Sequence, residues 1–243
     1  MRPRIAINCD VEARGPEGQF RRDRLALYTA YLDAIYSAGG EPVILPADLR
    51  ALPTLSSVDG ILLTGGDDYV SSIADPATPP ERYTAMHPRR EEFDTALVAA
   101  ATELDLPLLA ICAGFQLVVI HGGGKIYGDI EEEIGGEISH RRTSMDDPYP
   151  RHVIDWSGPA PKGLSERTGC VMSHHHQGVA SLPTDWRVWG SATDGVIEGA
   201  IGPGEWQVAV QWHPELAAED GDDRALFCAL VDAATIRASK SVG

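Results

Sequence analysis

Short apolar runs alternate with amphipathic stretches through the first half of this chain. The apolar runs have the length of buried strands, and they lie at residues 5–8, 42–46, 61–63 and 106–111. Residues 25–38 repeat apolar positions at helical spacing until Gly39 and Gly40 end the pattern, and residues 89–104 repeat them in the same way. This alternation of strands and helices is typical of a parallel sheet covered by helices.

The second half of the chain is richer in strand patterns. Strands are predicted at residues 152–156, 170–173, 186–189, 196–201 and 207–212, followed by a final helix at residues 223–239. Residues 11–24, 69–80 and 135–150 are expected to be loops, the last of them near a functional site. We therefore predict an α/β fold in a single domain over residues 1–243: a central, mostly parallel sheet flanked by helices, with added antiparallel strands.

The charge balance narrows the classes of partner. The 243 residues hold 20 Lys and Arg against 36 Asp and Glu, a formal net charge of -16. This charge argues against nucleic acid and against anionic membrane surfaces as partners. No apolar run approaches the roughly 18 residues of a membrane span, and the first strand is too short for the core of a signal peptide. The four cysteines are far apart in the sequence, so we expect reduced thiols in a cytoplasmic protein, with neither disulfides nor a zinc site.

Cys112 stands where the apolar run of residues 106–111 ends and a helical pattern begins. A sharp turn from strand to helix exposes such a side chain at the carboxyl edge of a sheet, the geometry of a nucleophile elbow. A helix N-terminus behind the sulfur favours the thiolate. Ala113 and Gly114 offer little obstruction to a substrate. The alternative is a buried core cysteine, since free cysteine is among the most buried residue types.

A base and its orienting acid are predicted directly after the strand at residues 207–212. His213 follows the strand end, and Pro214 restricts the backbone between His213 and Glu215. Glu215 can then hold one imidazole nitrogen while the other faces a thiol, which gives nucleophile, base and orienter. The alternative is a surface histidine beside an acid that caps a helix.

A site for an oxyanion is predicted where the strand at residues 61–63 ends, at Thr64, Gly65 and Gly66. Two glycines allow backbone N–H groups to point into open space, where they and the N–H of Ala113 could hold the oxyanion of a tetrahedral intermediate. The alternative is a simple turn from strand to loop.

Two further patterns are weaker. Lys125 follows three glycines, but the spacing of a phosphate-binding loop is absent, so no nucleotide site is expected there. The run His174, His175 and His176 could suggest a metal, but consecutive residues of a strand alternate between its faces. We therefore expect one or two of these histidines at the site and no metal.

These motifs together resemble the class I glutamine amidotransferase-like superfamily, and within it the peptidase C26 branch of the gamma-glutamyl-gamma-aminobutyrate hydrolase type. The pair Cys-x-Gly-x-Gln and His-Pro-Glu is specific, and Ser-x-His-His-Gln and Asp-Gly-Val-Ile-Glu point to this branch. The matching stretches cover most of the chain: residues 31–46, 63–68, 111–116, 122–130, 140–141, 150–152, 173–177, 194–198 and 211–215. The resemblance implies a flavodoxin-like fold.

The resemblance also implies a reaction and its residues. Cys112 would attack the side-chain amide carbon of a small gamma-glutamyl compound, with His213 as acid and base and Glu215 as its orienter. A glutamyl thioester would form, and water would release glutamate. The remaining implied residues are the oxyanion donors Gly65, Gly66 and Ala113 and the substrate-binding residues Gln116, Ser173 and His175. No cofactor is implied, and a homodimer is expected from the resemblance alone.

Two positions depart from the family pattern. Ala113 stands where the family usually has a large polar residue, and Met172 stands where it often has Asn. Both positions are expected near the substrate, so the resemblance does not identify the amine that is released. Two other functions remain as alternatives: the glutaminase subunit of an amidotransferase, and a binding protein without turnover on the same fold.

Overall fold

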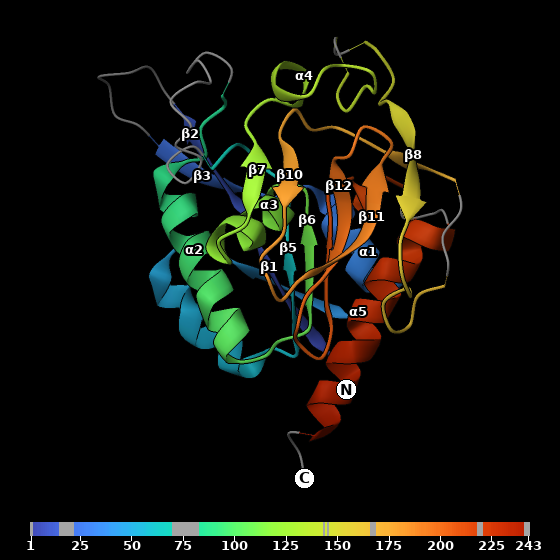
Figure 1. Cartoon of the computed structure of the whole chain (residues 1–243). Coiled ribbons are helices and arrows are strands. Elements are labelled where there is room, and N and C mark those ends of the chain that lie inside the picture. Colours follow the sequence, from blue (N-terminus) through green and yellow to red (C-terminus); the bar gives the residue numbers. More distant parts are fainter. Residues whose placement is uncertain are drawn as a thin grey trace.

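The centre of the molecule is a sheet whose middle strands run parallel. The computed structural model describes residues 2–14, 22–69, 83–142, 144, 146–165, 169–217 and 221–240. All of the described strands except β2 (Asp10–Arg14) and β3 (Arg22–Ala26) belong to one 11-stranded sheet (Figure 1). Its parallel part, in spatial order, is β4 (Glu41–Leu45), β1 (Arg4–Asn8), β5 (Gly60–Leu63), β6 (Leu108–Ile111) and β13 (Gln207–Val210). The predicted parallel core is therefore confirmed.

Antiparallel strands extend the sheet beyond β13, as predicted. In spatial order they are β12 (Ile197–Ile201), β11 (Arg187–Ala192), β8 (Arg151–Trp156) and β9 (Cys170–Met172). Two short strands were not predicted: β10 (Gly178–Ser181), which pairs with β12, and β7 (Lys125–Tyr127), which pairs with β10. Each has only three or four residues, too few to show a period in the sequence.

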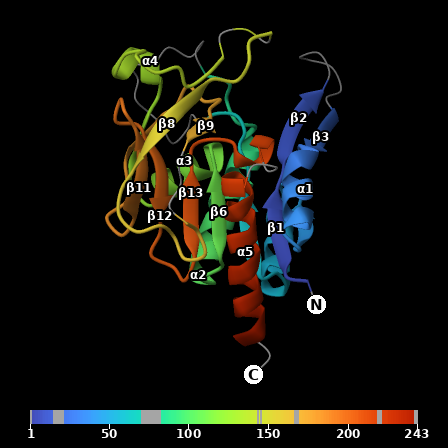
Figure 2. The same ribbon diagram turned by 90° about the vertical axis from the view of Figure 1, so that its right-hand side faces the viewer.

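Helices cover both faces of the parallel strands (Figure 2). On one face, α1 (Thr29–Ser37) and α5 (Gly221–Lys240) pack against Ile5 and Ile7 of β1. On the other, α2 (Pro88–Glu103) and α3 (Ala113–His121) share a core with Ala6 of the same strand, and a 3-10 helix (Leu49–Ser57) lies beside α2. Because successive side chains of a strand alternate between faces, one short apolar strand contributes side chains to two separate hydrophobic cores.

The region predicted as a loop at residues 11–24 contains a β-ribbon instead. Strands β2 (Asp10–Arg14) and β3 (Arg22–Ala26) pair antiparallel, while residues 15–21 lie outside the described residues. Val11 is opposite Leu25, and Arg24 forms a salt bridge with Glu12 at 2.7 Å. Two of the charged residues that suggested a loop, Glu12 and Arg24, thus share one face of a two-stranded ribbon. Because Leu25 belongs to β3, α1 begins four residues later than predicted.

Other boundaries shift little, but some expected core positions are exposed. Strand β4 lies at the edge of the sheet, where Ile44 is 49% exposed rather than buried. Leu104 and Ile236, near the ends of α2 and α5, are likewise 40% and 43% exposed. Most of the loop predicted at residues 69–80 lies outside the described residues. No helix in the described parts of the chain is long and apolar enough to cross a membrane.

The arrangement that matters for chemistry is the carboxyl edge of three neighbouring strands. β5, β6 and β13 are adjacent in the sheet and parallel, so Thr64, Cys112 and the segment from Gln211 to His213 follow their carboxyl ends at one edge. In Figure 1 the arrowheads of β5 and β6 point to this edge, on the opposite side of the molecule from the two termini. The three candidate motifs are therefore brought together by topology.

Candidate active site

Cys112 occupies a strained turn between β6 and α3. Its φ of 51° lies in the left-handed region, which side chains other than glycine seldom adopt. Its N–H donates to the carbonyl of Val210 at 2.8 Å, which fixes the turn against β13. A Cβ at Gly114 would come within 2.8 Å of Leu63, so only glycine lets α3 start this close to β5. Cys112 is only 6% exposed, but it lines a cavity, and this strand–turn–helix context is the one expected of a nucleophile at the N-terminus of a helix.

His213 lies beside Cys112 and is held by Glu215. The Nδ1 of His213 and the Oε1 of Glu215 are 2.7 Å apart, and the short 3-10 helix at Pro214–Ala217 positions the acid. Burial by itself would lower the pKa of His213, but the charges of Glu215 and Cys112 outweigh it and raise the pKa well above its usual value. The imidazole is thus kept protonated next to the sulfur, the state that an ion pair with a thiolate requires.

Two further buried side chains contact the group formed by Cys112, His213 and Glu215, and neither was predicted as functional. The Nε2 of Gln211 donates to the Sγ of Cys112 at 3.6 Å. Tyr31 accepts the N–H of Gly65 at 3.1 Å, and its pKa is raised well above the usual value by burial and by the neighbouring Glu215 carboxylate. Gln211 could have been found from the sequence, because it lies at the end of a buried strand and directly precedes the Trp-His-Pro-Glu motif.

The expected oxyanion donors lie at the same edge, but one of the three is already engaged. The N–H of Gly65 donates to the hydroxyl of Tyr31, so it already has an acceptor within the protein. For Gly66 and Ala113, none of the described residues accepts the backbone N–H. The carbonyl of Gly65 accepts from the buried Arg90 at 2.9 Å, which fixes the peptide that carries the Gly66 N–H. Gly66 and Ala113 are therefore the donors that this geometry offers.

Arg90 makes Gly66 sensitive to substitution. A Cβ at residue 66 would lie 2.8 Å from the Cζ of Arg90, whose guanidinium is buried and bonded to Asp94 and Thr64. Since Arg90 cannot yield, Gly66→Ala is expected to displace the backbone donor and to lower kcat by about 100-fold. Steady-state kinetics test this, with Gly221→Ala as the control because a Cβ there would meet nothing within 4 Å. Equal kinetics in both variants would remove Gly66 from the oxyanion site.

A cavity of ≈ 630 Å³ opens in front of Cys112. Its walls include Arg142, Tyr149 and His174 from the segments before and after β8 and β9, and the guanidinium of Arg142 stacks on the Tyr149 ring at 4.4 Å. Acidic side chains line it as well: Asp10, Glu12 and Asp67. The pKa of Asp67 is raised to about 6 by burial and by its acidic neighbours. The cavity thus combines a cationic stack with a group of carboxylates.

The three residues expected to bind substrate do not line this cavity. Gln116 donates to the carbonyl of Gln177 at 3.4 Å, and Ser173 donates to the carbonyl of His140 at 2.7 Å. His175 is buried with its Nδ1 at 2.8 Å from the carbonyl of Gln177. These three contacts are all made within the protein, so the substrate-binding roles of Gln116, Ser173 and His175 stay a prediction, whereas Arg142, Tyr149 and His174 do line the cavity.

The three consecutive histidines do not converge, although they follow β9 and are not part of a strand. His174 lines the cavity, His175 faces the buried Glu198, and His176 contacts Asp68 at 3.1 Å. Among the described residues all four cysteines are free, with Cys9 buried and Cys170 exposed.

Comparisons with known proteins agree with this geometry. The family model for peptidase C26 matches residues 3–215. The chain is 31% identical over 218 residues to the gamma-glutamyl-gamma-aminobutyrate hydrolase of Escherichia coli O157:H7, covering 83% of each chain. It is 30% identical over 201 residues to YvdE, a glutamine amidotransferase-like protein of Lactococcus lactis, covering 82% of this chain and 84% of the other.

A solved structure from Thermoplasma acidophilum, described as a GMP synthase subunit, has the same fold. It superposes with a TM-score of 0.65 at 15% identity, over 100% of this chain and 99% of the other. The family match covers β5, β6 and β13 together with the three motifs at their ends. The chain belongs to the peptidase C26 family and is a glutamine amidotransferase-like hydrolase.

Proposed function

We propose that this protein hydrolyses the gamma-glutamyl amide bond of a small gamma-glutamyl amine and releases glutamate. The observation that supports this most is Cys112 at a strained helix N-terminus beside the 2.7 Å pair of His213 and Glu215. Nucleophile, base and orienter stand at one wall of a cavity that is large enough for a gamma-glutamyl amine. Acyl transfer through a thioester is the chemistry that this arrangement serves.

Each residue has one task in the proposed reaction. The sulfur of Cys112 attacks the amide carbon, and the Gly66 and Ala113 N–H groups hold the oxygen that becomes negative. His213 gives its proton to the leaving amine, which breaks the carbon–nitrogen bond and leaves a glutamyl thioester. His213, now neutral, takes a proton from water, whose oxygen attacks the thioester and frees glutamate and the thiolate. Glu215 keeps the imidazole oriented throughout and stabilises its charged form.

The cavity walls support a polar substrate with charge at both ends. Arg142, held flat by its stack on Tyr149, suits the alpha-carboxylate of the glutamyl group. The carboxylates of Asp10, Glu12 and Asp67 suit an ammonium group more than a second carboxylate. Among small amides, the walls thus favour an amine that carries a further positive charge over gamma-aminobutyrate, which ends in a carboxylate.

Arg142→Gln is expected to raise KM for gamma-glutamyl substrates by about 10- to 100-fold, with a smaller change in kcat. A lost charge-assisted hydrogen bond to a ligand carboxylate has roughly that effect, and Arg142 is not at the reacting atoms. Initial-rate kinetics measure the split. Arg50→Gln is the control, because Arg50 is exposed and bonds to Asp48 on another surface. A fall in kcat at unchanged KM would contradict the assignment.

A panel of substrates tests the proposed activity. Glutamate release is measured with glutamine and with gamma-glutamyl derivatives of an uncharged amine, of a diamine and of gamma-aminobutyrate. The highest kcat/KM is expected for the diamine derivative. Release from glutamine alone, and only with a synthase partner, would favour the glutaminase subunit. No release from any compound, in protein whose Cys112 is alkylated readily, would favour the binding protein.

A further inference from the structure

A buried cluster of histidines surrounds Glu198 on β12, away from the cavity at Cys112. Three ring nitrogens approach the Oε1 of Glu198: the Nδ1 of His140 at 3.3 Å, the Nε2 of His152 at 3.2 Å and the Nε2 of His175 at 3.4 Å. All four side chains are buried. The sequence did not predict that these four residues would meet, because they come from two loops and two strands.

The outer nitrogens of two of these rings are already engaged. The Nε2 of His140 lies 2.8 Å from the Oδ2 of Asp194, and the Nδ1 of His175 lies 2.8 Å from the carbonyl of Gln177. Both partners are acceptors, so these nitrogens carry the proton in a neutral ring. The inner nitrogens of His140 and His175 then present lone pairs to the Glu198 carboxylate. Lone pairs and a carboxylate repel one another unless a positive charge lies between them.

Protonation of the histidines does not account for their distances from Glu198. A hydrogen bond from an imidazolium to a carboxylate is short, about 2.7–2.9 Å, whereas the inner distances are 3.2–3.4 Å. The inner nitrogens of all three rings and both oxygens of Glu198 make no hydrogen bond within the described structure. Two buried imidazolium groups would also have to be desolvated.

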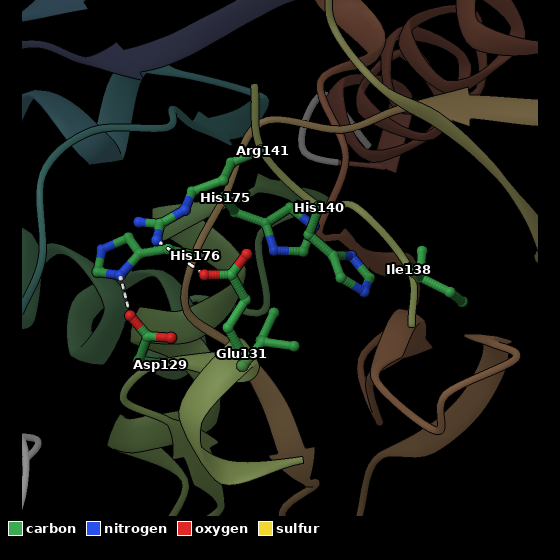
Figure 3. Close-up of a pocket in the computed structure, with 8 residues that line it drawn as sticks. Asp129, Glu131, Ile138, His140, Arg141, His175 and His176 are labelled. Atoms are coloured by element: carbon green, nitrogen blue, oxygen red, sulfur yellow. Dashed lines mark hydrogen bonds and ion pairs between the residues drawn. The ribbon is translucent and has the colours of Figure 1, made fainter. Parts of the chain in front are cut away.

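A metal ion explains the same distances directly. Ligand atoms about 2.0–2.1 Å from a tetrahedral zinc ion are about 3.3–3.4 Å from one another, and each of the three histidine nitrogens lies 3.2–3.4 Å from the Oε1 of Glu198. The ligand atoms of His140, His175 and Glu198 all lie within 4.8 Å of one another. Outer nitrogens that donate to a carboxylate and to a backbone carbonyl are the usual second layer of metal-binding histidines. Figure 3 shows the His140 and His175 rings side by side, with His176 turned away toward Asp129.

We propose that His140, His175 and Glu198 form a structural site for a divalent transition-metal ion with the ligand preferences of zinc. His152 contacts the same carboxylate oxygen from another side and is the fourth candidate ligand. Imidazole and carboxylate ligands suit zinc and its neighbours better than calcium or magnesium, which prefer oxygen alone.

The site would fix the segments that form the substrate cavity. Arg142 follows His140 by two residues, and His174 precedes His175, and both line the cavity at Cys112. Glu198 is linked to the nucleophile as well, because its carbonyl accepts the N–H of Gln211, whose side chain donates to Cys112. An ion bound to these three residues would therefore join two loops to the sheet next to the active site. The proposal does not depend on the proposed reaction.

The metal content of untagged protein tests the site. We expect about one equivalent of zinc-class metal per chain after gel filtration, measured by elemental analysis. Protein stripped with a chelator should gain about 5–10 °C in Tm on adding Zn²⁺. Co²⁺ should give the intense visible absorption of a tetrahedral site with nitrogen and oxygen ligands. If stripped, folded protein shows neither the Tm shift nor the Co²⁺ bands, the proposal is wrong.

Variants locate the ion. Glu198→Gln keeps the shape of the side chain but removes its charge, and His175→Asn removes a ring nitrogen; both should lose the metal and the Co²⁺ bands. His121→Asn, on the exposed end of α3, should keep both. Circular dichroism checks that each variant is folded. Undiminished metal binding in folded Glu198→Gln and His175→Asn would place the ion elsewhere and overturn the assignment.

Discussion

Cys112→Ala is expected to lower kcat/KM for glutamate release by about 10⁴-fold or more. The reason is that no other group at the cavity can form the acyl intermediate, and loss of a nucleophile from a triad removes most of the rate enhancement. The loss of stability should be much smaller than the loss of activity, since alanine also fits a buried turn between β6 and α3. The φ of 51° is strained for either residue. Glutamate release and thermal unfolding, measured on the same samples, separate the two effects.

The matched control is Cys170→Ala, because Cys170 is an exposed free cysteine on β9. It should keep the activity of the wild type. If Cys112→Ala retained more than about a tenth of the wild-type rate, nucleophilic catalysis by this residue would be excluded. A variant that simply failed to fold would be recognised by the loss of its unfolding transition.

His213→Asn is expected to lower kcat by about 10⁴-fold, the second of the two largest effects. Asparagine can still bond to Glu215, but it neither takes a proton nor carries a positive charge beside the sulfur. Alkylation of Cys112 at neutral pH should slow for the same reason. His121→Asn serves again as the control, since it changes a histidine at the surface. A near-normal rate in His213→Asn would mean that another group supplies the proton.

The raised pKa of His213 has a consequence for stability. In the unfolded chain the pKa is about 6.5, and in the folded chain it is well above that value, because Glu215 and Cys112 outweigh the opposing effect of burial. The ionic contribution of His213 to the free energy of unfolding is therefore complete below pH about 6.5 and is lost as the pH rises through the folded pKa. Urea unfolding of wild type and His213→Asn at pH 6 and at alkaline pH should show the difference shrinking at the higher pH.

The grouping of Cys112, His213 and Glu215 could be predicted from the sequence because local pattern and topology agree there. A short apolar strand followed by Cys112 implies a sharp turn, and parallel strands place their carboxyl ends at one edge. The same reasoning placed His213 and Glu215 after β13. The ribbon of β2 and β3 was missed because its charged residues alternate with few apolar ones, so tertiary pairing rather than composition decides its structure.

The loop residues that line the cavity and the histidine cluster at Glu198 could not be predicted in the same way. Arg142 and His174 reach the cavity from loops whose path depends on β8, β9 and the sheet edge. His152 and Glu198 are brought together by antiparallel pairing of β8, β11 and β12, and His140 and His175 reach them from two loops. Their spacing fits no metal-binding motif, so the triplet of histidines was a misleading signal and the relevant partner was a glutamate on another strand.

The glutamyl thioester on Cys112 is the central claim, and hydroxylamine tests it most directly. Two gamma-glutamyl amides with different leaving amines are hydrolysed with hydroxylamine present, and glutamate and gamma-glutamyl hydroxamate are quantified. A shared thioester predicts that both substrates give the same ratio of hydroxamate to glutamate, because the amine has left before water and hydroxylamine compete. Glutamate release without hydroxamate, or a ratio that changes with the leaving amine, would contradict the thioester.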